Sequence, residues 1–282
     1  MKITQLIRVF IFIILPVLAM SCDNNDEPTV PMKAPKKRGI MAIGASLIAP
    51  HNTWFEMACD NVGFKAYNKS IGGKMPFDYA YKLWTHEVFT EDEWNNTEIL
   101  VVQFANTGDI FSEDKLKNSV EEYYSDFHHD IDTNPFKTYS HAQNLDFILK
   151  YWQKLCREDE FNPKSKWYNV AGGKPFKVIL VTHWHDARVN YNQSIRKVAE
   201  KWNAVVCELD KNIGFTKDVP LPSGRQVSML YAVDSEIIDG VKYGWHPKPY
   251  VKGNEDDIQL KMSRILTDTF LKSNYLITDS IN

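Results

Sequence analysis

The chain has 282 residues, of which 44% are hydrophobic and 24% are charged, an ordinary balance for one or two globular domains. Its formal net charge is −3, so it lacks the basic field typical of nucleic-acid-binding proteins, and we expect no nucleic-acid partner. Aromatic residues make up 13% of the chain. Most of them are expected in the core, although exposed aromatic rings also stack on sugars.

Residues 1–21 have the features of a secretory signal peptide. Lys2 and Arg8 give the segment a positive start, and the apolar run over residues 9–20 is too short to span a bilayer comfortably. Small residues, Ala19 and Ser21, follow just before the expected cleavage point. We therefore exclude this segment from the prediction of the fold.

The sequence LAMSC at residues 18–22 resembles the lipobox of bacterial lipoproteins. The resemblance implies cleavage before Cys22, a diacylglycerol on its sulfur, and a lipid-anchored protein of the bacterial cell envelope, either periplasmic or on the surface. An ordinary secretory signal is the alternative. Residues 22–37 are rich in proline and charge, which predicts a flexible tether, and residues 38–282 form the predicted domain.

Along this domain, short apolar runs alternate with amphipathic stretches. The pattern predicts an α/β fold, a three-layer α/β/α sandwich around a five-stranded parallel sheet. Ligands of such sheets bind at the carboxyl ends of the strands. The expected elements in chain order are strand Gly39–Gly44, helix Thr53–Asn61, strand Phe64–Lys69, helix Phe77–Val88 with Tyr81, Trp84 and Val88 on one face, strand Glu98–Phe104, helix Asn144–Arg157, strand Lys177–Thr182, helix Ser194–Asn203, strand Ala204–Leu209 and helix Asp256–Ser273.

Two segments stand outside this alternation. Residues 111–140 form a polar, aromatic-rich insertion, and residues 219–245 have the prolines and turn dipeptides of a hairpin arm. Within the arm, Asp239-Gly240 is a strong two-residue turn signal. The three cysteines of the domain, Cys59, Cys156 and Cys207, lie in apolar periodic segments and are expected to be buried free thiols.

Four small polar motifs follow predicted strands or precede the last helix. Ser46 comes directly after the first strand, where a helix N-terminus favours a developing oxyanion. Gly73 follows the second strand and offers an unobstructed N–H, and Asn106 follows the third and offers a side-chain donor. His246 precedes the final helix. Each motif alone also suits a helix cap, a turn or a structural histidine.

Together the four motifs resemble the blocks of the SGNH (GDSL-like) hydrolases, in the same order and over residues 38–273. Asn68 stands five residues before Gly73, as in the second block of that family. The resemblance implies a flavodoxin-like fold and a serine esterase without a cofactor. Ser46 would be the nucleophile and His246 the base, with an oxyanion hole of Ser46, Gly73 and Asn106. The implied substrate is a small-molecule or polysaccharide ester, such as an acetyl ester on a carbohydrate.

The third member of the triad has no candidate at the family's usual position. Tyr243 stands three residues before His246, where the family has an aspartate. Asp239 is the nearest acid, but its place before Gly240 favours a turn role. A backbone carbonyl or an acid from elsewhere in the chain could orient the histidine instead.

Two other functions compete with the esterase. His183 and His185 follow the fourth strand and resemble the start of the metallo-β-lactamase motif, although Ala187 and Arg188 stand where an aspartate and a histidine are required. A zinc ion between His183, His185 and His246 is thus the weaker alternative, and we expect these two histidines to line the SGNH crevice without a metal. The other alternative is a non-catalytic surface glycan-binding protein that retains the fold.

Overall fold

The computed structural model describes residues 38–105 and 141–277, all within one unit that spans residues 36–282. The predicted signal peptide, Cys22, the tether, Asn106 and the insertion over residues 111–140 lie outside the described residues. Among the helices that the structure describes, none has the length and apolar character needed to cross a membrane.

The centre of the domain is a parallel sheet of five strands in the order β2-β1-β3-β4-β5. All five predicted strands are present, with ends that differ by one or two residues, and this topology confirms the predicted flavodoxin-like fold class. The strands β1 and β4 are buried along their whole length, because helices cover both faces of the sheet. The strands are β1 Gly39–Gly44, β2 Lys65–Asn68, β3 Thr97–Gln103, β4 Val178–Val181 and β5 Val205–Cys207.

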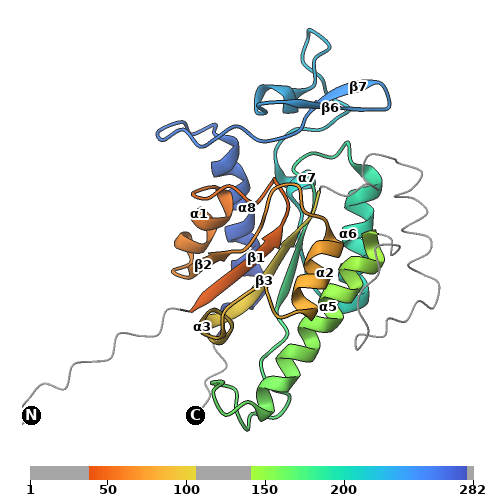
Figure 1. The fold of residues 1–282 in the computed structure, drawn as a ribbon. Helices are drawn as coiled ribbons and strands as arrows, with labels where there is room; N and C mark the ends of the chain where they lie inside the picture. The colour runs from red at the N-terminus through yellow and green to blue at the C-terminus, as the bar shows by residue number, and fades with distance from the viewer. Residues whose placement is uncertain (1–37, 106–140, 278–282) are drawn as a thin grey trace, which may run out of the picture. The chain divides into compact units, whose positions relative to one another are not determined.

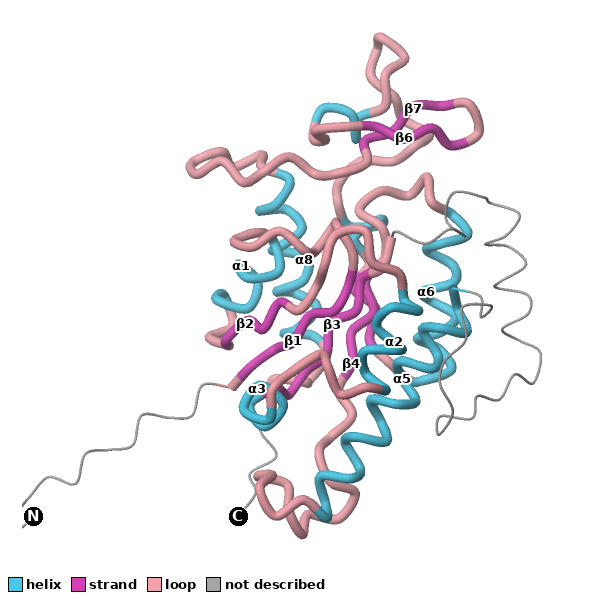
Figure 2. The backbone as a smooth tube through the Cα atoms, in the orientation of Figure 1, coloured by secondary structure: helices cyan, strands magenta, loops and turns pink. Residues whose placement is uncertain are grey.

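Helices form the two outer layers, as Figures 1 and 2 show. The helices α1 (Trp54–Asn61) and α8 (Ile258–Lys272) pack together on one face of the sheet. The helices α2 (Pro76–Trp84), α5 (His141–Glu158) and α6 (Val189–Trp202) pack in sequence on the other. The three-layer prediction is therefore confirmed. Cys59, Cys156 and Cys207 are buried free thiols, also as predicted.

The helix predicted over Phe77–Val88 is shorter than expected and buries a different face. It ends at Trp84, since the next turn closes at Thr85 and His86 adopts a left-handed backbone with φ of 58°. Its buried side chains are Pro76, Tyr79, Ala80 and Leu83, whereas Tyr81 is exposed. Tyr79 and Leu83 are four residues apart and therefore lie on one face of the helix. This face is buried in place of the face that we predicted.

Two short helices were not predicted. The helix α3 (Glu91–Asn96) begins with a capping box in which the Glu93 N–H donates to Thr90 Oγ1 and the Thr90 N–H donates to the Glu93 carboxylate. A threonine followed three residues later by glutamate is a sequence signal for such a start. The other is the single-turn helix α7 (Leu209–Asn212), which directly follows β5.

The hairpin arm consists of β6 (Ser235–Ile238) and β7 (Val241–Gly244) and lies at the carboxyl edge of the sheet (Figure 1). Asp239 and Gly240 both have positive φ, 50° and 78°, which is the signature of a two-residue type I′ turn. The predicted turn role of Asp239 is thus confirmed. Beyond the strands the pairing continues less regularly, to a bridge between Ala232 and Pro247.

The start of α8 depends on the buried side chain of Asp257, which generates a test of stability. One carboxylate oxygen accepts the N–H groups of Gln259 and Leu260, and the other accepts the N–H of Val251 in the loop before the helix. We expect Asp257→Ala to lower the free energy of unfolding by about 1–2 kcal/mol, the range for loss of a helix cap. Urea unfolding followed by circular dichroism measures the change.

The variant Asp257→Ser is the matched control, because a serine hydroxyl also caps a helix. It should lose clearly less stability than the alanine variant. Equal losses in the two variants would show that capping is not what Asp257 contributes.

Candidate active site

Ser46 lies in a tight turn directly after β1, at the point of the sheet where the strand order reverses. The Ala45 N–H donates to the Gln103 carbonyl at 3.0 Å, so β1 stays bonded to β3 up to the residue before the serine. A side chain on Gly44 would clash with that same carbonyl of Gln103. The close approach of the two strands therefore requires glycine there, and it fixes the backbone that carries the half-buried Ser46.

Asn68, at the end of β2, ties the next loop to the serine turn. Its side-chain N–H groups donate to the Ile48 carbonyl and to Glu56 Oε1, both at 2.8 Å, and its Oδ1 accepts the Ser70 N–H. Ile71 also donates its N–H to the Gly44 carbonyl at 3.1 Å. The structure thus gives Asn68 a role in positioning the loop after β2 against the turn of Ser46.

This loop then passes Ser46 through two glycines. A methyl group on Gly72 would lie 3.9 Å from Ser46 Cβ, an ordinary van der Waals distance, so the loop passes close to the serine at Gly72. Gly73 follows with φ of 78°, a conformation that favours glycine. The assignment of Gly73 to an oxyanion hole stays a prediction, as does that of Asn106, which lies outside the described residues.

The structure brings Ser46 and His246 together and adds an acid that the sequence analysis missed. His246 Nε2 lies 2.9 Å from Ser46 Oγ, and His246 Nδ1 lies 2.6 Å from Asp234 Oδ2. The His246 backbone N–H donates to Asp234 Oδ1 at 2.8 Å. With its ring proton on Nδ1, facing the carboxylate, His246 presents a lone pair to the serine hydroxyl. This is the arrangement of a serine nucleophile, a general base and an orienting acid.

Asp234 reaches His246 because of the hairpin register. The pairs on either side of the turn run from Ile238–Val241 to Ser235–Gly244, and the Trp245 N–H then donates to the Asp234 carbonyl at 3.1 Å. Counting outward from the two-residue turn at Asp239-Gly240 therefore finds Asp234 beside the residue that precedes His246. The turn dipeptide was therefore a sequence signal for Asp234. The family's usual spacing, with an acid three residues before the histidine, does not lead to this residue.

The carboxylate of Asp234 is half-exposed, with 49% of its side chain accessible, and His246 exposes 32%. Partial burial by itself would raise the pKa of Asp234, but the hydrogen bonds from the His246 ring and backbone N–H groups outweigh it and lower that pKa below its ordinary value. Asp234 is therefore ionised at neutral pH, as the orienting role requires.

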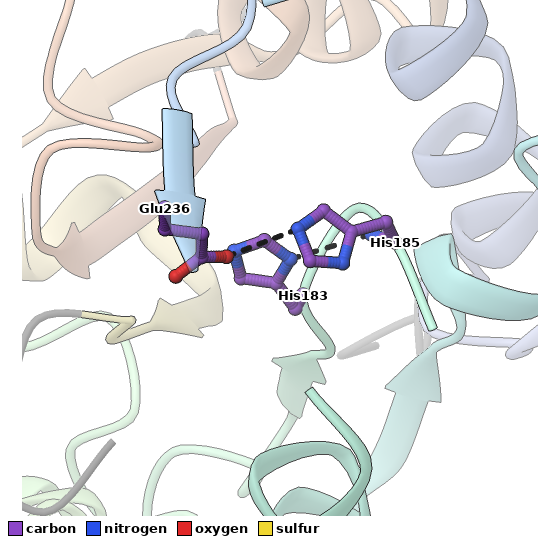
Figure 3. Close-up of side chains that lie close together, drawn as sticks. All are labelled: His183, His185 and Glu236. Atoms are coloured by element: carbon purple, nitrogen blue, oxygen red, sulfur yellow. Dashed lines mark hydrogen bonds and ion pairs between the residues drawn. The ribbon is translucent and has the colours of Figure 1, made fainter. Parts of the chain in front are cut away.

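His183 and His185 do not line a crevice, contrary to our expectation, because both are completely buried behind the hairpin. His185 Nε2 lies 3.1 Å from Glu236 Oε1 (Figure 3). The same nitrogen lies 3.0 Å from the Gly244 carbonyl. His183 Nδ1 accepts the His185 backbone N–H at 3.3 Å. Burial lowers the pKa of His183 well below its ordinary value, and the nearby His185 and Arg188 lower it further, so His183 is neutral.

The zinc set suggested by the sequence, His183, His185 and His246, does not form. The ring nitrogens of His246 face Ser46 and Asp234 instead. Within residues 38–105 and 141–277, the cluster with metal-ligating atoms is His183, His185 and Glu236, whose candidate atoms all lie within 4.8 Å of one another. Glu236 also forms an ion pair with Arg188, which already neutralises its charge.

Comparisons with known proteins were made for family and for structure. The model of the family described as "Domain of unknown function (DUF5040)" matches residues 37–273. A comparison with curated proteins gave no match.

Several solved structures are similar to this chain. A lipolytic protein of the G-D-S-L family from Desulfitobacterium hafniense is 10% identical, with 83% of this chain and 99% of that chain covered and a TM-score of 0.42. A lipase/acylhydrolase from Enterococcus faecalis is 12% identical, with 84% and 95% covered and a TM-score of 0.40. A carbohydrate esterase family 2 enzyme from Corynascus thermopiles is 11% identical, with 86% and 68% covered and a TM-score of 0.38.

The position of the acid gives a direct test with two aspartates of the same hairpin. Asp234→Asn should lower kcat for p-nitrophenyl acetate on the order of a hundredfold, because the amide no longer stabilises a protonated His246; the buried triad aspartate of a serine protease is worth more, about 10⁴. Asp239→Asn should cost less than about tenfold, or roughly 1.4 kcal/mol of barrier, since asparagine suits the same turn.

Thermal unfolding of both variants shows whether the hairpin is intact. A large loss in Asp239→Asn at unchanged stability, or full activity in Asp234→Asn, would refute the assignment of the acid.

Proposed function

This chain belongs to the family described as "Domain of unknown function (DUF5040)", and we propose from its geometry that it is a serine esterase. The observation that supports the proposal most is the unbroken series of contacts from Asp234 through His246 to Ser46, with distances of 2.6 and 2.9 Å. Ser46 is half-buried in a turn at the carboxyl edge of the sheet, where ligands of such folds bind.

The chemistry follows from the positions of these atoms. Ser46 Oγ attacks the carbonyl carbon of an ester while its proton passes to His246 Nε2. Asp234 accepts a hydrogen bond from the other ring nitrogen and stabilises the imidazolium that forms. His246 then returns the proton to the leaving alcohol as the acyl–oxygen bond of the ester breaks. A water molecule, activated by the same histidine, hydrolyses the acyl-serine and regenerates the free hydroxyl.

Stabilisation of the oxyanion is assigned to the Ser46 and Gly73 N–H groups and to the side chain of Asn106. Support for the first two comes from the loop after β2, which passes close to Ser46 at Gly72 and is bonded to Gly44. Fixed donors aimed at a developing oxyanion are usually the largest single contribution to such catalysis. The Asn106 assignment is based on the sequence motif alone.

The proposed substrate is a small-molecule or polysaccharide ester, such as an acetyl ester on a carbohydrate. The support is the resemblance of the four motifs to the SGNH hydrolases and the 13% aromatic content of the chain, since exposed aromatic rings stack on sugars. A purely glycan-binding protein is the less favoured alternative, because binding alone does not need a serine, a histidine and an aspartate in hydrogen-bonded contact.

For its location we propose the bacterial cell envelope, where lipid on Cys22 holds the protein at a membrane. The tether over residues 22–37 connects the lipid to the domain and lets the domain move away from the membrane surface. The support is the lipobox resemblance and the proline-rich, charged composition of the tether. An envelope location would also place the active site among polysaccharide esters.

The nucleophile is tested by Ser46→Ala, which removes one oxygen and should leave the fold intact. Hydrolysis of p-nitrophenyl acetate should fall by about 10⁴-fold or more, since the loss of a triad nucleophile has effects of this size or larger. A fluorophosphonate probe should label the wild type at Ser46 alone, as peptide mass spectrometry shows. Labelling at another residue, or an unlabelled and inactive wild type, would refute the serine esterase.

The anchor is tested by Cys22→Ala in a bacterial host that lipidates its own lipoproteins. The wild type should fractionate with membranes, and the variant should appear in the soluble fraction, because acyl chains rather than a spanning helix hold the protein. A variant that stays with the membrane through an uncleaved N-terminus would contradict the lipoprotein.

A further inference from the structure

A buried polar cluster fastens the hairpin to the loop after β4, and we infer that it positions the catalytic pair. The cluster, which we call the hairpin anchor, consists of His185, Arg188 and Glu236. Its members touch neither Ser46 nor the substrate. They hold Asp234 and His246 in place and are therefore positioning residues. The inference rests on the proposed esterase function.

The hairpin anchor holds the two strands of the hairpin at once. His185 Nε2 donates both to Glu236 Oε1 on β6 and to the Gly244 carbonyl on β7, at 3.1 and 3.0 Å. Glu236 is two residues after Asp234, and Gly244 is two residues before His246. A single ring N–H from the body of the domain therefore fixes each strand close to its catalytic residue.

Further contacts along the loop reinforce the hairpin anchor. The Arg188 guanidinium pairs with the other oxygen of Glu236 and lies over the Trp245 ring, 5.6 Å from its centre. Trp184 Nε1 donates to the Trp245 carbonyl at 2.9 Å, and the His185 ring stacks on Tyr243. The residue before His246 is thus held through its carbonyl and its ring.

Burial makes these contacts strong and directional. The side chains of His185, Arg188 and Glu236 expose only 2%, 4% and 8% of their surface. Water cannot replace a lost partner at such depth, so breaking one of these hydrogen bonds or the ion pair is costly. These contacts therefore favour one position of the hairpin on the domain.

The same atoms could be thought to bind a divalent cation, but the contacts favour the hairpin anchor. His185 Nε2 faces two acceptor oxygens, so it carries a proton and does not offer a lone pair to a metal. The negative charge of Glu236 is already balanced by Arg188.

The seat of the hairpin matters because His246 must approach Ser46 within hydrogen-bond distance, 2.9 Å in this structure. A misplacement of about 1 Å can cost on the order of a hundredfold in rate. Asp234 and His246 move together on the hairpin, so loosening the hairpin anchor should disturb the contact with Ser46 while the contact between them survives.

The experiment compares two substitutions of His185 in the full chain. Phenylalanine keeps a planar ring for stacking on Tyr243 but donates no proton, and we expect His185→Phe to lower kcat about a hundredfold with KM nearly unchanged, following the cost of misplacement. Glutamine carries two protons on one nitrogen and can serve both Glu236 and Gly244, so His185→Gln should retain most of the activity. Equal loss in the two variants, or a rise in KM alone, would overturn the inference.

A matched control separates positioning from general stability. Asp159 is also buried, and its partners among the described residues are Trp94, whose Nε1–H it accepts at 2.9 Å, and Lys174, neither of which belongs to the hairpin. Asp159→Asn should lower the thermal midpoint while kcat per folded molecule stays at the wild-type value. If it lowers kcat as much as His185→Phe does, the effect is loss of stability and the positioning role is refuted.

Three measurements that need no turnover complete the test. The downfield proton NMR signal of the His246–Asp234 hydrogen bond should persist in His185→Phe, whereas labelling of Ser46 by a fluorophosphonate should slow by the same factor as kcat.

Zinc content, measured by mass spectrometry before and after EDTA, should be the same in wild type and variant; stoichiometric zinc lost on substitution of His185 would replace the hairpin anchor with a metal site. A wild type that shows the NMR signal but has no activity would refute the esterase. Loss of that signal in His185→Gln would refute the hairpin anchor independently.

Discussion

The geometry of the proposed active site depends on the register of one antiparallel pairing. The two-residue turn at Asp239-Gly240 sets which residues face each other, and the Trp245 N–H consequently meets the Asp234 carbonyl. The next N–H along the chain, that of His246, meets the carboxylate of the same aspartate. A slip of one residue would move every side chain of one strand to the other face and would separate the acid from the base. The strongest turn signal in the sequence is thus also what assembles the catalytic pair.

The site divides into two parts that are held by different forces. Ser46 belongs to the sheet, where the contact of β1 with β3 at Gly44 and the bonds of Asn68 leave its backbone little freedom. His246 and Asp234 belong to an arm outside the three layers, joined to each other by two hydrogen bonds. Core packing fixes the first part. The second is held by polar contacts with the loop after β4 and by a small apolar cluster of Ala187, Ile238 and Tyr243.

The sequence predicted most of what depends on local pattern. The strands β1 and β4 are continuous apolar runs, as expected for a sheet covered on both faces, and Ser46 and His246 follow from the order of the motifs. It could not predict contacts that depend on folding at a distance. His183 and His185 are polar residues after a strand end, a pattern that favours a crevice, and only the pairing of His185 with the later Glu236 and Gly244 explains why they are buried. Asp234 was missed for a different reason, since its partner is set by a turn and not by a fixed spacing to the histidine.

The half-exposed Asp234 shows how such an arm can orient a histidine without a deep pocket. A single ion pair in contact with water is weak, because solvent screens the charges and both side chains lose freedom. Here, the carboxylate accepts both the ring N–H and the backbone N–H of His246, so one residue presents two donors in a fixed relation. The backbone bond holds the carboxylate in place, and the ring bond leaves Nε2 facing Ser46. The orientation of the base is therefore built into the hairpin itself, and what the rest of the domain must supply is the position of that hairpin over the serine.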